Sequence, residues 1–380
     1  MLTEEVINGS KAHDLPKEIV ENEIATLLKG IEIKEEFNPH QPFDPEKHIL
    51  YKENDFEKVR IHKLKELGID KTHVPSISDV AVTDPFPLFT EDACNIMKWE
   101  AFQTKNVEKY GKIPIMSKGT TSTDFQVCGY TKNSPFTVAA WKHPKTQEIV
   151  NKFAGVRLKI MFDYEIAHIN ASLISSKYGS GHRETNENGA NPEEDSKAVF
   201  DWHYDSNSFS AVLMLSTNDK MEGGKTGLKT GSEDVVYVDG PRIGYVTIIQ
   251  GRVVKHIATK PKTNDERISS IVGYVPESLD VPDTTVLTTF RPSVSPRSLH
   301  NEYYPQWMEY RFKRIEDRLA RKRKELIRNS EHGKIFEQLE VVEFCEDISN
   351  YLSKSWNEFE SVVDNEIFPP KIFSTPYNEL

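Results

Sequence analysis

Between residues 156 and 276, hydrophobic and polar residues alternate in short runs that turn-forming residues separate. The runs are rich in β-branched and aromatic residues, which favour strands. They are VRLKIMFDYEIAHINASLI, FDWHYDSNSFSAVLMLS, LKTGSEDVVYVD, IGYVTIIQ, RVVKHIAT and ERISSIVGYVP. Gly, Asp, Asn and Pro fill the connections. Several short strands with turns this close together predict an antiparallel sandwich or barrel.

The period of the pattern becomes helical elsewhere in the chain. Thr90 is a plausible N-cap for a helix that runs to about Phe102, because two acids follow it in the first turn. After residue 304, apolar residues recur every three or four positions and predict two helices. These residues are Met308, Phe312, Ile315, Leu319 and Leu326, then Ile335, Leu339, Val342, Cys345, Ile348, Leu352, Trp356 and Phe359.

Two polar stretches complete the organisation. Residues 1 to about 75 are rich in Glu, Lys, Asn and Pro, and we expect an arm that wraps on a core or is partly mobile. Residues 179–197 have no apolar face and predict a long mobile loop. We therefore expect an α+β protein. It would have an N-terminal arm over 1–80, a central domain over 81–303 with its strand-rich core at about 155–290, and C-terminal helices over 304–380 packed on the core.

Composition narrows the partners. The 380 residues are 37% hydrophobic, and the net charge is 48 − 59 = −11, so we expect neither a broad nucleic-acid surface nor an anionic-membrane surface. The longest apolar run, Ala211 to Leu215, is far short of the roughly 20 residues of a spanning helix. The start MLTEEVINGS does not resemble a signal peptide. Three widely spaced cysteines favour reduced thiols, so we expect a cytoplasmic protein, with a nuclear location left open.

The stretch DWHYDSNSF places His203 and Asp205 two positions apart. On a strand, such residues project to the same side and could bind one ion together. A His-x-Asp pair also arises by chance in a chain with twelve histidines, so a surface or hydrogen-bonded pair is the alternative. The sequence contains two His-x-Glu pairs as well, but His182 lies in the polar loop and His300 precedes the helices. Neither has a strand to hold it.

His256 is the candidate third ligand. It lies in RVVKHIAT among apolar β-formers, which favours an inward-facing position on a later strand; a buried histidine with satisfied hydrogen bonds is the alternative. Two histidines and one carboxylate occupy one face of an octahedron around Fe(II) and leave three positions open. Zinc accepts the same ligands, so ligand identity does not fix the metal.

Arg267 and Ser269 are again two positions apart, eleven residues beyond His256. A buried arginine beside a hydroxyl is suited to hold a carboxylate through a charge-assisted pair. An arginine on a surface strand is the alternative interpretation. Beside an iron site, the pair would anchor an acid that reaches the metal.

In order and spacing, these five residues resemble the motif of the iron(II)/2-oxoglutarate-dependent oxygenases. The resemblance covers about residues 155–280, and the stretch DPFPLFTEDA is similar to the N-terminal part of fungal small-metabolite members. It implies a double-stranded β-helix, a cupin-like jelly roll, with flanking N-terminal and C-terminal helices. It also implies Fe(II) bound by His203, Asp205 and His256. Arg267 and Ser269 would hold the distal carboxylate of the cosubstrate 2-oxoglutarate.

The resemblance further implies a small-molecule substrate, dioxygen as co-reactant, and release of succinate and carbon dioxide. Hydroxylation is the default outcome, with desaturation and ring closure open; the substrate and the oligomeric state are not fixed by the sequence. The loop at 179–197 would be a lid. His168 and Asn170 are further candidates to face the pocket, outside the predicted site.

Three other functions remain open on the sequence. An iron oxidase that does not use 2-oxoglutarate could use the Arg-x-Ser pair to hold its substrate's own carboxylate. A non-catalytic jelly-roll binding protein and a histone demethylase of the same broad fold are the others, and the demethylases usually lack this Arg-x-Ser arrangement. The basic run over residues 311–328 carries nine basic and three acidic residues. We interpret it as the solvated face of a helix rather than as a nuclear signal or an anion-binding patch.

Overall fold

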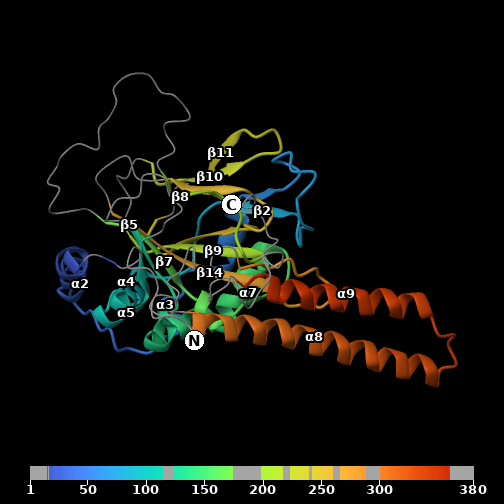
Figure 1. The fold of residues 1–380 in the computed structure, drawn as a ribbon. Helices are drawn as coiled ribbons and strands as arrows, with labels where there is room; N and C mark the ends of the chain where they lie inside the picture. Colours follow the sequence, from blue (N-terminus) through green and yellow to red (C-terminus); the bar gives the residue numbers. More distant parts are fainter. Residues whose placement is uncertain are drawn as a thin grey trace, which may run out of the picture.

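The computed structural model describes residues 15, 17–113, 124–173, 198–216, 223–238, 242–259, 266–287 and 300–359. Two antiparallel sheets form its centre, and helices flank them (Figure 1). The expected mixture of helices and antiparallel strands is therefore confirmed. The predicted loop at 179–197 lies outside the described residues. None of the helices in the described ranges is both long enough and apolar enough to cross a membrane.

The two sheets are built from strands that the chain distributes between them. The larger sheet has the order β1-β2-β12-β9-β14-β7-β5-β4, with β3 on β12 and β6 on β14; the smaller has the order β11-β10-β13-β8. From β7 to β14 the chain changes sheet at every connection except the β10–β11 hairpin. The strands of the larger sheet are β1 (Ile61–Lys63), β2 (Val80–Thr83), β3 (Phe86–Pro87), β4 (Gly111–Lys112), β5 (Asp124–Val127), β6 (Leu158–Ile160), β7 (His168–Ser172), β9 (Phe209–Met214), β12 (Tyr245–Ile249) and β14 (Arg267–Pro276). Those of the smaller sheet are β8 (Ala198–His203), β10 (Thr226–Lys229), β11 (Val235–Val238) and β13 (His256–Thr259).

Strand β14 shows how alternation separates the core from the cavity. Arg267, Ser269 and Ile271 line a cavity that residues of both sheets enclose. Ile268 and Val272 point to the opposite face and belong to the main hydrophobic core. The period of two thus gives one strand a polar, cavity-facing side and an apolar, core-facing side.

Helices supply the rest of that core. Residues of α4 (Glu91–Ala101), α6 (Pro135–Lys142) and α7 (Pro144–Ala154) are buried in the same cluster as those of β9, β12 and β14. Thr90 caps α4 as predicted, since its Oγ1 accepts a hydrogen bond from the backbone N–H of Ala93. The remaining helical elements before residue 170 are η2 (Ile19–Ile24), α2 (Ala25–Glu32), α3 (Pro45–His48), η3 (Glu53–Lys58), α5 (Thr104–Tyr110), η4 (Tyr130–Asn133) and η5 (Asp163–Glu165).

The segment 156–174 differs from the strand pattern expected of it. It forms the two strands β6 and β7, separated by the 3-10 turn η5. Ala167 adopts a left-handed conformation with φ of 59°, and its carbonyl accepts a hydrogen bond of 2.6 Å from the Tyr130 hydroxyl. This long-range contact fixes the turn, which the local sequence alone does not indicate.

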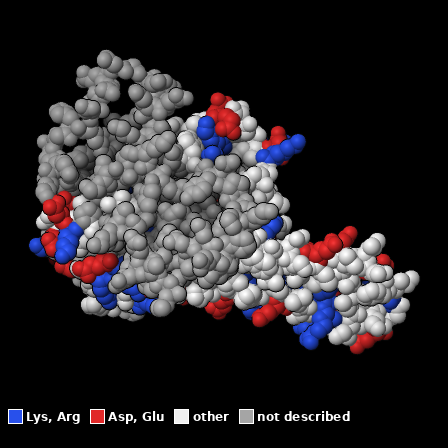
Figure 2. Space-filling view, in the orientation of Figure 1, with Lys and Arg blue, Asp and Glu red and all other residues white. Residues whose placement is uncertain are grey.

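The two predicted C-terminal helices are α8 (His300–Glu331) and α9 (Gln338–Asn357), which form a hairpin that extends away from the sheets (Figure 1). Tyr303 and Trp307 are buried at its base. The apolar stripes are only partly covered, however: Phe312 is 47% exposed and Leu339 is 78% exposed. Along its outer length each helix packs mainly on the other, so one face of each stays in solvent. Acidic and basic side chains are interspersed over the visible described surface (Figure 2).

Candidate metal centre

His203 and His256 meet across the smaller sheet. His203 ends β8, His256 begins β13, and the two are direct partners in the antiparallel pairing. Their ring centroids are 4.3 Å apart. Oδ1 of Asp205 lies 3.4 Å from Nε2 of His203 and 3.5 Å from Nε2 of His256. These three side chains are the one group of potential metal ligands found in the described part of the chain.

The loop that carries Asp205 is held by the loop before β13. The backbone N–H of Asp205 donates to the carbonyl of Gly251 at 2.9 Å. On the side chain, the Ser210 hydroxyl donates to Oδ2 at 2.5 Å. A Cβ atom on Gly251 would lie 1.9 Å from the same Oδ2, so only glycine leaves the carboxylate its position. Ser210 and Gly251 therefore orient Asp205 towards the two histidines.

The tautomer of His256 suits a metal ligand. Its Nδ1 lies 3.0 Å from the carbonyl of Val254, and because a carbonyl only accepts, Nδ1 carries the proton. Nε2 then keeps its lone pair on the side of Asp205. Two adjacent ligand atoms bound at about 2.1 Å lie about 3 Å apart, close to the separations seen here. The donor set thus fits one divalent ion, and these three residues could hold iron.

The charges of the three residues are coupled. Burial opposes ionisation of Asp205, but His256 and His203 outweigh it and hold the pKa of Asp205 well below its ordinary value. Burial also lowers the pKa of His256, yet the neighbouring Asp205 outweighs that effect and raises it. A carboxylate that stays ionised while buried is a site for positive charge, whether protons or a metal ion supply it.

Arg267 is 2% exposed and lies on the larger sheet. Its Nε donates to the carbonyl of Gly224 at 3.1 Å, and one terminal nitrogen donates to the hydroxyl of Ser269 at 3.3 Å. Burial lowers the pKa of Arg267 to about 10, so the group remains cationic at neutral pH. Within the described ranges, no carboxylate forms an ion pair with it. A buried cation without a counter-ion favours an anionic ligand.

All five predicted site residues line the same cavity, which has a volume of about 80 Å³. The structure adds residues that the motif did not include, among them Gln126, Glu165, Asn207 and Ser210. His168 and Asn170 also line it, and their spacing on the strand before the loop was a usable signal. Gln126 lies on β5, outside the stretch that resembles the oxygenases, and Glu165 lies in the η5 turn.

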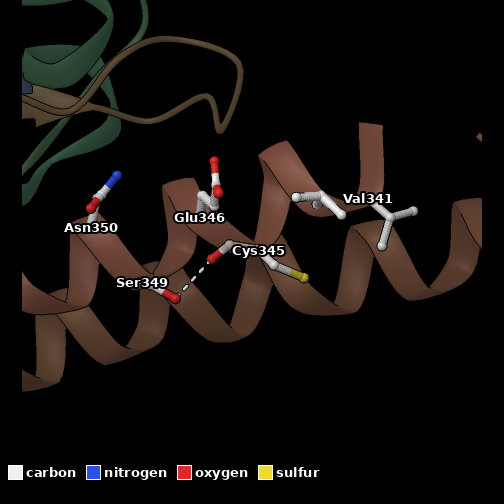
Figure 3. A pocket seen from close by; sticks show the side chains of 6 residues that line it. Val341, Cys345, Glu346, Ser349 and Asn350 are labelled. Atoms are coloured by element: carbon white, nitrogen blue, oxygen red, sulfur yellow. Dashed lines mark hydrogen bonds between the residues drawn. The ribbon is translucent and has the colours of Figure 1, made fainter. Parts of the chain in front are cut away.

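A second depression lies on the outer face of α9 (Figure 3). Its lining residues are Val341, Val342, Cys345, Glu346, Ser349 and Asn350. The only hydrogen bond drawn there joins the Ser349 hydroxyl to the Cys345 carbonyl within the helix. With one carboxylate and no histidine, this face lacks the donor set of the cavity between the sheets.

No protein-family model matches the sequence, and no curated protein matches it significantly. Solved structures do match. An oxidoreductase of the 2OG-Fe(II) oxygenase family from Burkholderia pseudomallei is 14% identical, with 42% of this chain and 71% of that chain covered and a TM-score of 0.30. A putative oxygenase from Shewanella oneidensis is 12% identical, with 58% and 86% covered and a TM-score of 0.34.

The epimerase SnoN from nogalamycin biosynthesis, in complex with Fe3+, alpha ketoglutarate and nogalamycin RO, is 15% identical. It matches over 42% of this chain and 67% of that chain, with a TM-score of 0.28. At these values the likeness transfers neither activity nor substrate. Several of the solved structures similar to this chain are those of 2OG-Fe(II) oxygenases.

Proposed function

We propose that this protein is an Fe(II)- and 2-oxoglutarate-dependent oxygenase that oxidises a C–H bond of a small metabolite. One cavity contains both the His203, Asp205 and His256 group and the buried guanidinium of Arg267, which has no carboxylate partner among the described residues, and this observation carries the proposal. The first is a donor set for iron, and the second is a site for the far carboxylate of a diacid.

The roles of the residues follow from this placement. Iron and 2-oxoglutarate would supply the oxidation of substrate by dioxygen, with succinate and carbon dioxide as the other products. His203, Asp205 and His256 would hold the metal, and Ser210 would orient the Asp205 carboxylate. Arg267 and Ser269 would hold the distal carboxylate through charge-assisted hydrogen bonds. The two sheets around the cavity would exclude water from the reacting C–H bond.

We also propose that the two sheets are a double-stranded β-helix, the jelly-roll architecture. The order of β7 to β14 supports this, because four of these strands lie in each sheet and the chain passes back and forth between them. The oxygenase domain would then span 81–303, with an arm over 1–80 and added helices over 304–380. A cytoplasmic location remains part of the proposal.

The test is to add Fe(II) and 2-oxoglutarate without oxygen and to record the visible metal-to-ligand charge-transfer band. Asp205→Ala should abolish the band, and Arg267→Ala should require far more 2-oxoglutarate to produce it. Arg242→Ala, which removes an exposed arginine outside the cavity, is the control and should behave as the wild type. Succinate release would then screen substrates.

Two other outcomes have defined meanings. Iron binding without a band at any 2-oxoglutarate concentration would favour an oxidase that does not use this cosubstrate, with Arg267 holding a carboxylate of the substrate. A wild-type protein that binds no iron would favour a non-catalytic binding protein.

A further inference from the structure

One wall of the cavity carries polar atoms that have no hydrogen-bond partner in the described part of the chain. Gln126, Glu165 and His168 line it, and Gln126 and Glu165 are 2% and 4% exposed. Oε1 of Gln126, Oε1 of Glu165 and Nε2 of His168 are each buried and have no hydrogen-bond partner among the residues that the structure describes. Buried polar atoms are nearly always paired, and an unpaired one lowers the stability of the folded state. Three on one wall of one cavity favour a ligand that pairs with them.

Each of these three atoms can accept a hydrogen bond: the Gln126 oxygen always, the Glu165 oxygen when the group is ionised, and Nε2 of His168 in the tautomer with its proton on Nδ1. The Gln126 amide nitrogen donates to Oδ1 of Asn170 at 2.7 Å, so its oxygen is the unpaired end. A carboxylate oxygen accepts, and a neutral imidazole accepts at one nitrogen. Burial lowers the pKa of His168 to about 3, so its ring is neutral.

The wall runs along the larger sheet. Gln126 lies level with Ser269, because both pair with Asn170, and Glu165 lies at the far end. A Cβ atom on Gly273 would lie 2.8 Å from Oε2 of Glu165. Gly273 is six residues beyond Arg267 on β14, so Glu165 lies at the end of the wall farther from Arg267. Gly273 pairs with Ser210, whose hydroxyl binds Asp205. A short diacid that extends from Arg267 to the metal would therefore leave the Glu165 end free.

We propose that Gln126, Glu165 and His168 bind a protonated primary amino group of the substrate, an inference that rests on the proposed oxygenase function. An alkylammonium group has three N–H donors and no acceptor, which matches three acceptors on one wall. It also brings one positive charge to a buried carboxyl group. The substrate class is then amines and amino acids, and the C–H bond oxidised lies near the nitrogen, because the wall adjoins Asp205.

The electrostatic setting of Glu165 agrees with this assignment. Burial, then repulsion by Asp205, raise the pKa of Glu165 to about 8, while Lys112 opposes them. The free protein thus holds a carboxyl group that no neighbouring cation fully stabilises as an anion. A bound ammonium would provide that stabilisation and release a proton from Glu165 near neutral pH.

The experiment is calorimetric titration of the metal-free protein at pH 7 with n-butylamine, 1-butanol and butyrate. The amine should bind saturably and the other two should not. Glu165→Gln, which keeps the shape but not the charge, should weaken amine binding by about tenfold or more. Glu100→Gln is the matched control, because Glu100 is equally buried but accepts its hydrogen bonds from Phe136 and Thr137, away from the cavity.

Gln126→Leu is the second variant and should weaken amine binding several-fold, even if Glu165→Gln folds poorly. The proposal is overturned if the amine does not bind at millimolar concentration, if butanol or butyrate binds equally well, or if both wall variants bind the amine as the wild type does. Because the titration uses metal-free protein, its result is independent of the charge-transfer test. Amine binding without a charge-transfer band would refute the oxygenase function and support the amine site. A band without amine binding would support the oxygenase function and refute the amine site.

Discussion

The Asp205 carboxylate packs directly against the Cα atom of Gly251, in a space that a methyl group would fill. Gly251→Ala should displace the carboxylate from the two histidines. Since residues that orient a ligand typically change metal affinity by about 10–100-fold, we expect a loss of that size. The metal affinity is measured by titration with Mn(II), monitored through the electron spin resonance signal of the ion. Gly30→Ala is the control, because a Cβ atom there meets nothing within 4 Å, and it should leave metal affinity unchanged.

Glu165 should make the stability of the metal-free protein depend on pH. Its pKa is about 8 in the folded protein and near 4.5 in the unfolded chain. Between these values the folded state binds a proton that the unfolded state does not, so the free energy of unfolding falls as pH rises. Glu165→Gln should remove this contribution, and the variant should gain stability relative to the wild type from pH 5 to pH 8. Urea unfolding of both proteins at several pH values measures this gain. A difference in the free energy of unfolding that stays constant with pH would contradict the raised pKa of Glu165.

Spacing along strands explains only part of the candidate site. Arg267 and Ser269 are two positions apart on β14, and this period fixes a common side. His203 ends β8 and Asp205 lies in the loop after it, so strand alternation does not explain how Asp205 reaches His203. The contacts of Ser210 and Gly251 with Asp205 depend on loops that meet only after folding. Glu165 reaches the cavity through a turn that Tyr130 fixes from a distant element. No local pattern encodes such contacts.

At the scale of elements, a buried charge network joins the C-terminal hairpin to the body. The Asp283 side chain is 1% exposed and lies 3.2 Å from the Arg311 guanidinium. The Tyr310 hydroxyl donates to the same carboxylate oxygen at 2.6 Å, and Tyr351 of α9 donates to it as well. Asp283→Asn leaves Arg311 and Arg314 without their anion, so we expect a loss of about 3–5 kcal/mol. Urea unfolding followed by tryptophan fluorescence, which includes Trp307 at the hairpin base, measures it.

The matched control is Asp280→Asn, an exposed acid that pairs with Arg321, and it should change stability by less than about 1 kcal/mol. The pH dependence gives a second check. Burial opposes ionisation of Asp283, but Arg311 and Arg314 outweigh it and keep its pKa below the ordinary 3.8. The stabilisation from ionised Asp283 is therefore present above the ordinary pKa of 3.8 and is lost as pH falls through the lower pKa of the folded state. Equal losses in the two variants would refute a special role for Asp283.

The elements themselves were largely predictable, and their environments were less so. Each predicted strand run between residues 198 and 276 contains an observed strand, because alternation and turn residues agree there. The helical period predicted α8 and α9 but not that Leu339 would be exposed. Periodicity reports which residues of a helix share a face, and it does not say whether anything covers that face. The basic run is only partly the solvated helix face that was predicted. Arg311 and Arg314 are buried and pair with Asp283. Lys313 and Arg321 are exposed, as predicted.

At the scale of the whole molecule, the two sheets contribute different halves of the site. His203 and His256 are on the smaller sheet, while Arg267 and Ser269 are on the larger one. A ligand that binds both the metal and Arg267 would join the sheets across the cavity. Metal alone would contact only the smaller sheet and the Asp205 loop, so it would join the two sheets less completely.

The stability of the folded protein should therefore respond to metal and 2-oxoglutarate together. A ligand at 100 times its dissociation constant stabilises the folded state by about 2.7 kcal/mol. We expect 2-oxoglutarate to add about this much in the presence of Mn(II) and little without it, because the keto acid end needs the metal. The urea midpoint with each ligand alone and with both measures the effect. Arg267→Ala should keep the contribution of the metal and lose that of 2-oxoglutarate, whereas Arg242→Ala should keep both. If 2-oxoglutarate stabilised metal-free protein equally well, the two sheets would not share one ligand through the metal, and Arg267 would belong to a separate anion site.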